Sequence, residues 1–133
     1  MKYQKLMLGA ALLVGLQGLA RAELVVIGAP GAAALTKDQV ADIYLGKSTA
    51  ATPVDLPEGN ATRNDFYSKA TGRDAAQVKA TWSRLVFTGK GQPPKEYPDA
   101  GAVKKAVAAD PKAIGYIDKS AVDGSVKVLL TLQ

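Results

Sequence analysis

The chain divides near residue 22, and this division limits how much of it can form a folded core. Two lysines at the start are followed by an apolar run over residues 6–20, and residues 20–22 read Ala-Arg-Ala. This pattern predicts a secretory signal peptide over residues 1–22, cleaved after Ala22. A membrane anchor is disfavoured because the apolar run is shorter than the ~20 residues that a span needs and is interrupted by Gln17. The other 111 of the 133 residues suffice for one domain with a modest core.

Two missing residue types narrow the chemistry of this domain. The sequence contains no His and no Cys, which excludes disulfides, zinc sites with nitrogen or sulfur ligands, haem or iron–sulfur ligation by those residues, and Ser-His-Asp or Cys-His nucleophiles. We therefore expect no cofactor and no metal. The net charge of +5 includes three basic residues of the predicted signal peptide. Without them, the sequence contains 14 basic and 12 acidic residues. That balance does not point to nucleic acid, and no basic run supports it.

The hydrophobic pattern of residues 23–133 predicts an α/β domain with one sheet and about four helices. An unbroken apolar run at its start predicts a buried strand, and Thr36 opens a capping box before a helix. Along a later helix, Val78, Trp82, Leu85 and Val86 share one face, which predicts that this face is buried. Gly115, in a predicted strand, allows either a bulge or close packing. The expected order is strand 23–28, helix 37–45, extended segment 53–56, helices 60–72, 74–87 and 100–109, and strands 113–118 and 126–130.

The segment between the extended stretch and the second helix carries the candidate binding site. A Gly turn leads into a helix that opens with small and polar residues. Its free backbone N–H groups and partial positive charge, with the hydroxyl of Thr62 and the guanidinium of Arg63, suit an oxyanion such as phosphate. The alternative is an ordinary capped helix with an exposed Arg, since every helix start has free N–H groups. The candidate ligand-binding residues are Glu58, Gly59, Asn60, Ala61, Thr62 and Arg63.

Catalysis finds little support in the sequence. The paired carboxylates Glu58 and Asp65, or Asp38 and Asp42, are suited in principle to acid–base work. No nucleophile or metal cluster accompanies them, and Asp38 is explained by the positive end of its helix. We therefore expect no catalytic residues and no enzyme activity.

Three blocks of the sequence resemble the phosphate-binding, type II periplasmic solute-binding proteins of ABC transporters. Residues 35–47 resemble that family's helix ending in Gly-Lys, and residues 58–66 lie where the family has an acidic residue, Gly-Ser-Gly-Thr and a helix with Phe. Residues 102–107 and 111–117 resemble its Val-rich helix and the strand after it. The resemblance spans nearly all of residues 24–130.

The resemblance implies a type II periplasmic binding protein-like fold, but members of the family have two lobes and usually over twice this length. Residues 23–133 have room for one lobe, a mixed sheet flanked by about four helices, with the ligands of the other lobe missing. Asn60 replaces the family's Ser, Ala61 its second Gly, and Leu56 an Arg found before the motif. The implied site is therefore open to solvent, where water competes for each hydrogen bond.

Two functions follow from these observations. The first is an exported periplasmic protein that binds and releases phosphate or a related oxyanion, with Glu58 or Asp65 as acceptor for the proton of phosphate. The second is a periplasmic interaction module that kept the fold without tight ligand binding and docks through the face that the missing lobe would cover. The implied partners are an ABC permease, an envelope sensor protein or a second copy that completes the site. Nucleic acid and stable membrane insertion after signal cleavage are not expected.

Overall fold

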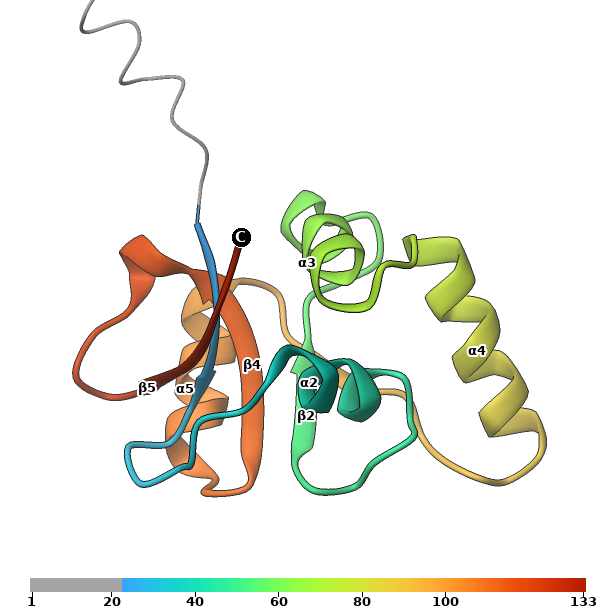
Figure 1. The fold of residues 1–133 in the computed structure, drawn as a ribbon, viewed down its shortest axis with the longest axis horizontal. Coiled ribbons are helices and arrows are strands. Elements are labelled where there is room, and N and C mark those ends of the chain that lie inside the picture. Colours follow the sequence, from blue (N-terminus) through green and yellow to red (C-terminus); the bar gives the residue numbers. More distant parts are fainter. Residues whose placement is uncertain (1–22) are drawn as a thin grey trace, which may run out of the picture.

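The computed structural model describes residues 23–133, so the predicted signal peptide lies outside the described residues. This part of the chain forms one mixed sheet of five strands in the order β3-β2-β4-β1-β5 (Figure 1). β2 runs parallel to β3 and β4, whereas β1 runs antiparallel to both β4 and β5. The strands are β1 (Leu24–Gly28), β2 (Thr52–Asp55), β3 (Lys95–Glu96), β4 (Ala113–Asp118) and β5 (Lys127–Leu132).

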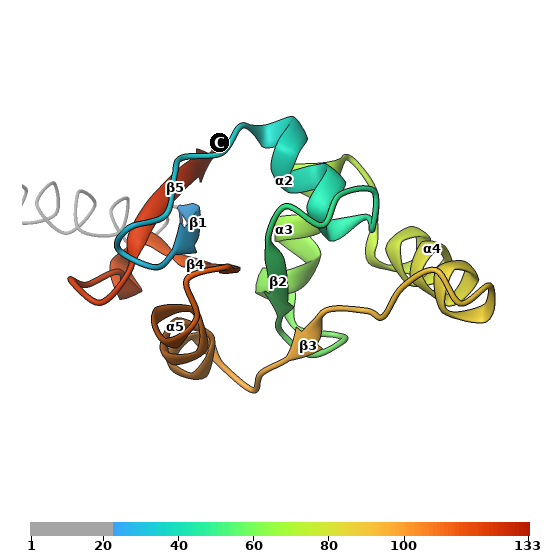
Figure 2. The ribbon, with the colours of Figure 1, turned by 90° about the horizontal axis from the view of Figure 1, so that it is seen from below.

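The helices begin at side-chain caps that the sequence supplies locally. Thr36 and Asp74 each form a capping box, and the carboxamide of Asn60 accepts from the amide of Arg63. α5 packs on one face of the sheet, and α2 and α3 lie on the opposite side (Figure 2). The helices are α2 (Lys37–Tyr44), α3 (Ala61–Thr71), α4 (Ala75–Phe87) and α5 (Ala100–Ala109). The predicted α/β fold is thereby confirmed.

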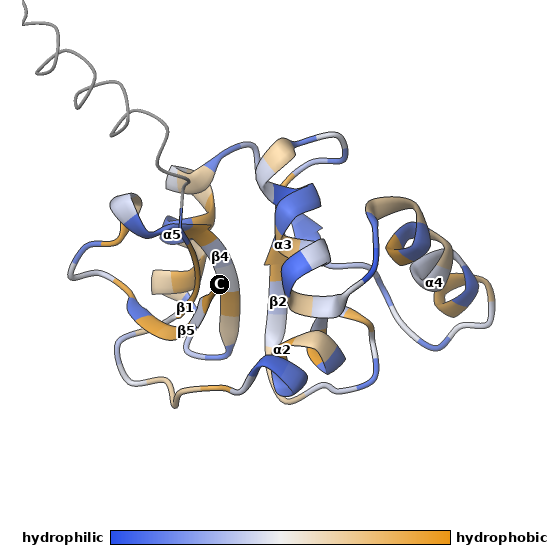
Figure 3. Ribbon diagram, turned by 45° about the horizontal axis from the view of Figure 1, so that its top comes forward, coloured by the Kyte–Doolittle hydropathy of each residue, from blue (hydrophilic) through white to orange (hydrophobic). Residues whose placement is uncertain are grey.

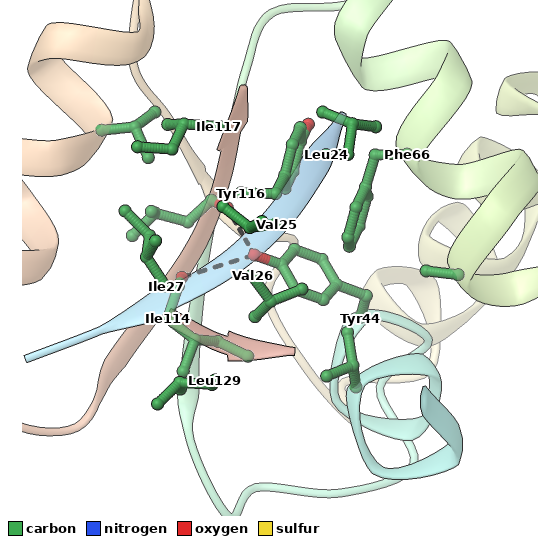
Figure 4. Close-up of a cluster of buried hydrophobic side chains, with 14 of the residues drawn as sticks. Leu24, Val25, Val26, Ile27, Tyr44, Phe66, Ile114, Tyr116, Ile117 and Leu129 are labelled. Carbon is green, nitrogen blue, oxygen red and sulfur yellow. Dashed lines mark hydrogen bonds between the residues drawn. The ribbon is translucent and has the colours of Figure 1, made fainter. Parts of the chain in front are cut away.

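The core combines aliphatic strand residues with an aromatic cluster. All five residues of β1 are buried, as the unbroken apolar run predicts for a strand covered on both faces. Hydrophobic residues gather on the strands, while α3 is largely hydrophilic (Figure 3). The rings of Phe66 and Tyr116 stack with centroids 3.9 Å apart, and Tyr44 meets Phe66 edge-on at 4.7 Å (Figure 4). Aromatic rings thus contribute to the packing of α3 against the sheet.

The prediction for α4 is only partly right. Val78 is buried, and Trp82 donates from Nε1 to the Tyr44 carbonyl (2.9 Å). Val86, however, is 44% exposed, because α4 lies beyond the edge of the sheet (Figure 1) and, among the helices and strands, packs mainly against α3. The loop expected after α4 also contains the two-residue strand β3, which the sequence did not reveal. β5 extends two residues further than expected.

Close packing, one of the two interpretations of Gly115, accounts for this glycine. A Cβ at this position would lie 2.7 Å from Val103 Cγ1 and 3.0 Å from Val54 Cγ2. We expect Gly115→Ala to destabilise the protein by about 1–3 kcal/mol, because α5 must move away from β4. Urea unfolding monitored by circular dichroism measures this. Gly124→Ala is the matched control, since nothing lies within 4 Å of a Cβ there, and an equal loss in both variants would contradict the packing argument.

Among the described residues, no helix has the length and apolar character needed to cross a membrane.

Candidate functional site

The candidate site begins where β2 ends and the chain turns into α3. Gly59 has a φ of 85°, and nothing lies within 4 Å of where its Cβ would be. This left-handed conformation favours glycine. The amide of Asn60 donates to the Pro57 carbonyl (3.1 Å), which closes the turn. Asn60 is the N-cap of α3, because its Oδ1 accepts from the amide of Arg63 at 3.1 Å.

The first turn of α3 presents backbone donors. Within the described residues, the amides of Ala61 and Thr62 have no acceptor, as expected for the first positions of a helix. Ala61 is exposed and Thr62 is half-buried. With the positive end of the helix dipole, these N–H groups can receive an anion from solvent.

Arg63 is held inside the protein by its own carboxylate partners. Its Nη1 donates to the Leu56 carbonyl (2.9 Å) and to Glu96 Oε2 (3.1 Å). Its Nε lies 3.8 Å from Asp55 Oδ1 and is buried without a hydrogen bond. Burial alone would lower the pKa of Arg63, but Asp55 and the other neighbours raise it. The guanidinium therefore stays charged and fastens the start of α3 to β2 and β3.

One nitrogen of Arg63 remains available. Nη2 has no hydrogen-bond partner within the described residues. The residue also lines a hollow of about 220 Å³, together with Glu58, Gly59, Ala75, Ala76 and Lys79. The sequence suggested a guanidinium of Arg63 that is free to bind an anion. In the structure its Nη1 is already hydrogen-bonded within the protein, so no more than one edge of the guanidinium, at Nη2, can contact a ligand.

Five of the six predicted site residues, Gly59 to Arg63, lie in the Gly turn and the first helical turn of α3. The sixth, Glu58, directly precedes them and lines the hollow beside Arg63. The exposed Glu58 carboxylate pairs with Lys79 (3.3 Å). Asp65, the other candidate acceptor for a phosphate proton, pairs with Lys69 one turn further along α3 (3.4 Å). Glu58 is therefore the better placed of the two. No group of three or more acidic residues that could hold a metal occurs within residues 23–133.

The sequence did not single out Asp55, the charged group at the centre of the site. This carboxylate is 1% exposed and accepts hydrogen bonds from the hydroxyls of Tyr67 and Tyr116 and from the amide of Leu56. Burial, followed by the charge of Asp55, raises the pKa of both tyrosines strongly. The feature of the sequence that could have identified Asp55 is its position as an acidic residue at the end of an apolar strand, shortly before the Gly turn.

The fold has clear counterparts among solved structures, although the sequence matches no protein-family model and no curated protein. An ABC-type phosphate transport receptor of Vibrio cholerae superposes with a TM-score of 0.63 at 20% identity, covering 81% of this chain and 45% of that one. A Clostridium perfringens protein described as a phosphate ABC transporter substrate-binding protein with bound phosphate gives 0.62 at 27% identity, covering 81% and 44%. PstS of Borrelia burgdorferi gives 0.59 at 13% identity, covering 82% and 47%.

The chain spans under half the length of each of these proteins. The resemblance inferred from three short sequence blocks is thereby confirmed for the fold. Residues 23–133 have the fold of a single lobe of the phosphate ABC transporter substrate-binding proteins.

Proposed function

We propose that this protein binds phosphate or a related oxyanion reversibly at the start of α3. The observation that carries the proposal is the pair of amides without an acceptor within the described residues, those of the exposed Ala61 and the half-buried Thr62, just after the end of β2. The Clostridium perfringens structure with bound phosphate, which shares this fold, supports it. No bond is made or broken, so the protein acts as a binding protein and not as an enzyme.

Each of the six predicted residues has its own role in binding the anion. Ala61 and Thr62 offer backbone N–H groups, Thr62 its hydroxyl, and Asn60 the amide nitrogen that its capping role leaves over. Arg63 contributes positive charge and Nη2, Gly59 allows the turn, and Glu58 accepts the proton of phosphate, which sulfate lacks. Because one lobe leaves the anion half in water, we propose weak binding unless a partner covers it. An ABC permease, an envelope sensor protein or a second copy would serve, after export to the periplasm and cleavage following Ala22.

Ala61→Pro is the sharpest test of the site. Proline at the first helical position keeps the helix and removes only the N–H group, and the extended backbone of Asn60 (φ −71°, ψ 130°) accepts a following proline. Losing a hydrogen bond to an anion costs about 1.5–3 kcal/mol, so we expect phosphate affinity to fall at least about tenfold. Calorimetric titration with phosphate, then sulfate, measures this.

Ala100→Pro is the matched control, because Ala100 is the first residue of α5, also follows an extended N-cap, Asp99, and does not line the hollow beside Arg63. Equal phosphate affinity in both variants and the unaltered protein would contradict a site at the start of α3. No heat from a folded sample at millimolar phosphate would favour the second candidate, a docking module. One observation supports that candidate: Asp55 and Glu96 already occupy the guanidinium of Arg63.

A further inference from the structure

A second hollow lies at the other end of β2 from the proposed phosphate site. This groove has a volume of about 790 Å³, against about 220 Å³ for the hollow beside Arg63. It runs from the beginning of β2 and β4 to the ends of α2 and α5, whereas α3 starts after β2 has ended. Its volume lies within the range of about 300–1,000 Å³ that is usual for small-molecule sites.

The floor and one wall of the groove are apolar and aromatic. Buried Ile43 and Val54 form part of the floor, and the rings of Trp82, Pro94 and Tyr97 also line the groove. The indole of Trp82 is fixed by its hydrogen bond to the Tyr44 carbonyl (2.9 Å). Flat rings held in this way bind apolar bodies with little loss of side-chain freedom, because they are already ordered.

The loop that closes this wall is also fixed. The amide of Lys90 donates to the Leu85 carbonyl (2.8 Å), and the amide of Gly89 donates to the Val86 carbonyl (3.0 Å). Gly91 passes so close to Trp82 that a Cβ there would lie 3.4 Å from the indole. These contacts hold Lys90 and Gly91 in place at the side of the groove that Trp82 lines.

The charge around the groove is positive. Lys90, Lys95 and Lys112 line it, and Asp110 is the one acidic residue among its lining residues. Within the described residues, none of these three ammonium groups makes an ion pair or a hydrogen bond. Exposed cations beside an apolar floor complement a ligand that has an apolar body and a negative end.

We propose that this groove binds a small amphipathic organic anion, namely an aromatic or branched apolar body that carries a carboxylate. The apolar body lies against Trp82 and Pro94, and the carboxylate meets the lysines at the rim, among them Lys95, whose ammonium group lies over the ring of Tyr97 (5.5 Å to its centroid). Inorganic phosphate has no apolar body and would gain nothing from this floor. The groove is therefore a second site, independent of the proposed phosphate site.

Dansylglycine and its neutral amide form a matched pair of probes. Trp82 is the only tryptophan of the sequence, so energy transfer from tryptophan to the dansyl group reports binding near this residue. We expect saturable one-to-one binding of dansylglycine to the purified protein, and about fivefold weaker binding of the amide, because the amide loses the attraction of exposed lysines. Phosphate should not displace either probe.

Two pairs of variants locate the probe. Lys90→Gln with Lys112→Gln should reduce dansylglycine affinity to that of the amide, whereas Lys37→Gln with Lys105→Gln, two exposed lysines outside the groove, should leave it unchanged. Ala109→Phe fills the groove from the exposed end of α5 and should abolish binding of both probes. Ala80→Phe, on an equally exposed residue outside the groove, should not.

Several results would overturn the proposal. Absence of saturable energy transfer in a folded sample would remove the site, and equal affinities for dansylglycine and its amide would reduce it to an apolar patch. Displacement of the probe by phosphate would place the probe in the phosphate site. Binding of an acidic peptide without binding of dansylglycine would make the groove a protein-docking surface.

Discussion

Raising the pH above 10 is expected to unfold the protein steeply. Tyr44, Tyr67 and Tyr116 are buried, and burial, with the neighbouring Asp55 carboxylate, raises the pKa of all three well above the ordinary value of 10.0. A tyrosine with a raised pKa in the folded state stabilises fully below pH 10, and this contribution is lost as the pH rises, since only the unfolded chain releases the proton. Each tyrosine removes about 1.4 kcal/mol per pH unit, so the three together remove about 4 kcal/mol per unit.

Two pH units above 10 would thus remove about 8 kcal/mol, which is comparable with the whole stability of a typical domain. Urea unfolding at a series of pH values gives the slope of the free energy of unfolding against pH. Tyr44→Phe should reduce this slope by about one third, although it also costs the hydrogen bond from the Tyr44 hydroxyl to the Val54 carbonyl (2.8 Å). A slope that is the same in both proteins would show that Tyr44 ionises in the folded state.

Replacing Asp55 by Ala should destabilise the protein by about 3–5 kcal/mol, because it removes one partner of a buried ion pair. The hydroxyls of Tyr67 and Tyr116 and the amide of Leu56 lose their acceptor in the same step. The guanidinium of Arg63 then keeps only Glu96 and the Leu56 carbonyl. Urea unfolding at neutral pH measures the loss as a lower midpoint with an unchanged slope.

Glu96→Gln is the control for this prediction. Glu96 also meets Arg63, but its side chain is 47% exposed, so we expect a loss below about 1 kcal/mol. The double variant Asp55→Ala, Arg63→Ala should lose less than the sum of the single variants, since neither charge is then left without its partner. Additive losses, or equal losses for Asp55→Ala and Glu96→Gln, would contradict a buried pair at this position.

The sequence predicts this fold well where structure is decided by neighbouring residues. Thr36 caps its helix as expected, and Asn60 and Asp74 cap theirs in the same way, because capping needs partners only three residues away. The buried strand β1 follows from its apolar run. β3, in contrast, has two residues and exists only through its pairing with β2, a contact between residues about forty positions apart.

The candidate site likewise has one part that neighbouring residues determine and another that depends on residues far apart in the sequence. The Gly turn and the helix start are local, and the sequence predicts both. The pairing of Arg63 with Glu96 and with Asp55 depends on how β2 and β3 come together. A sequence pattern shows an arginine at a helix start but not the carboxylates that the sheet brings to it, so the internal engagement of Arg63 was not foreseen.

The position of β1 between β4 and β5 has a consequence for the folding kinetics. Leu24, at the beginning of the domain, pairs with Asp118 in β4 and with Leu132 in β5, next to the end of the chain. β1 therefore stays unpaired until β4, about ninety positions further along the chain, has been synthesised, and closing such a long loop slows folding.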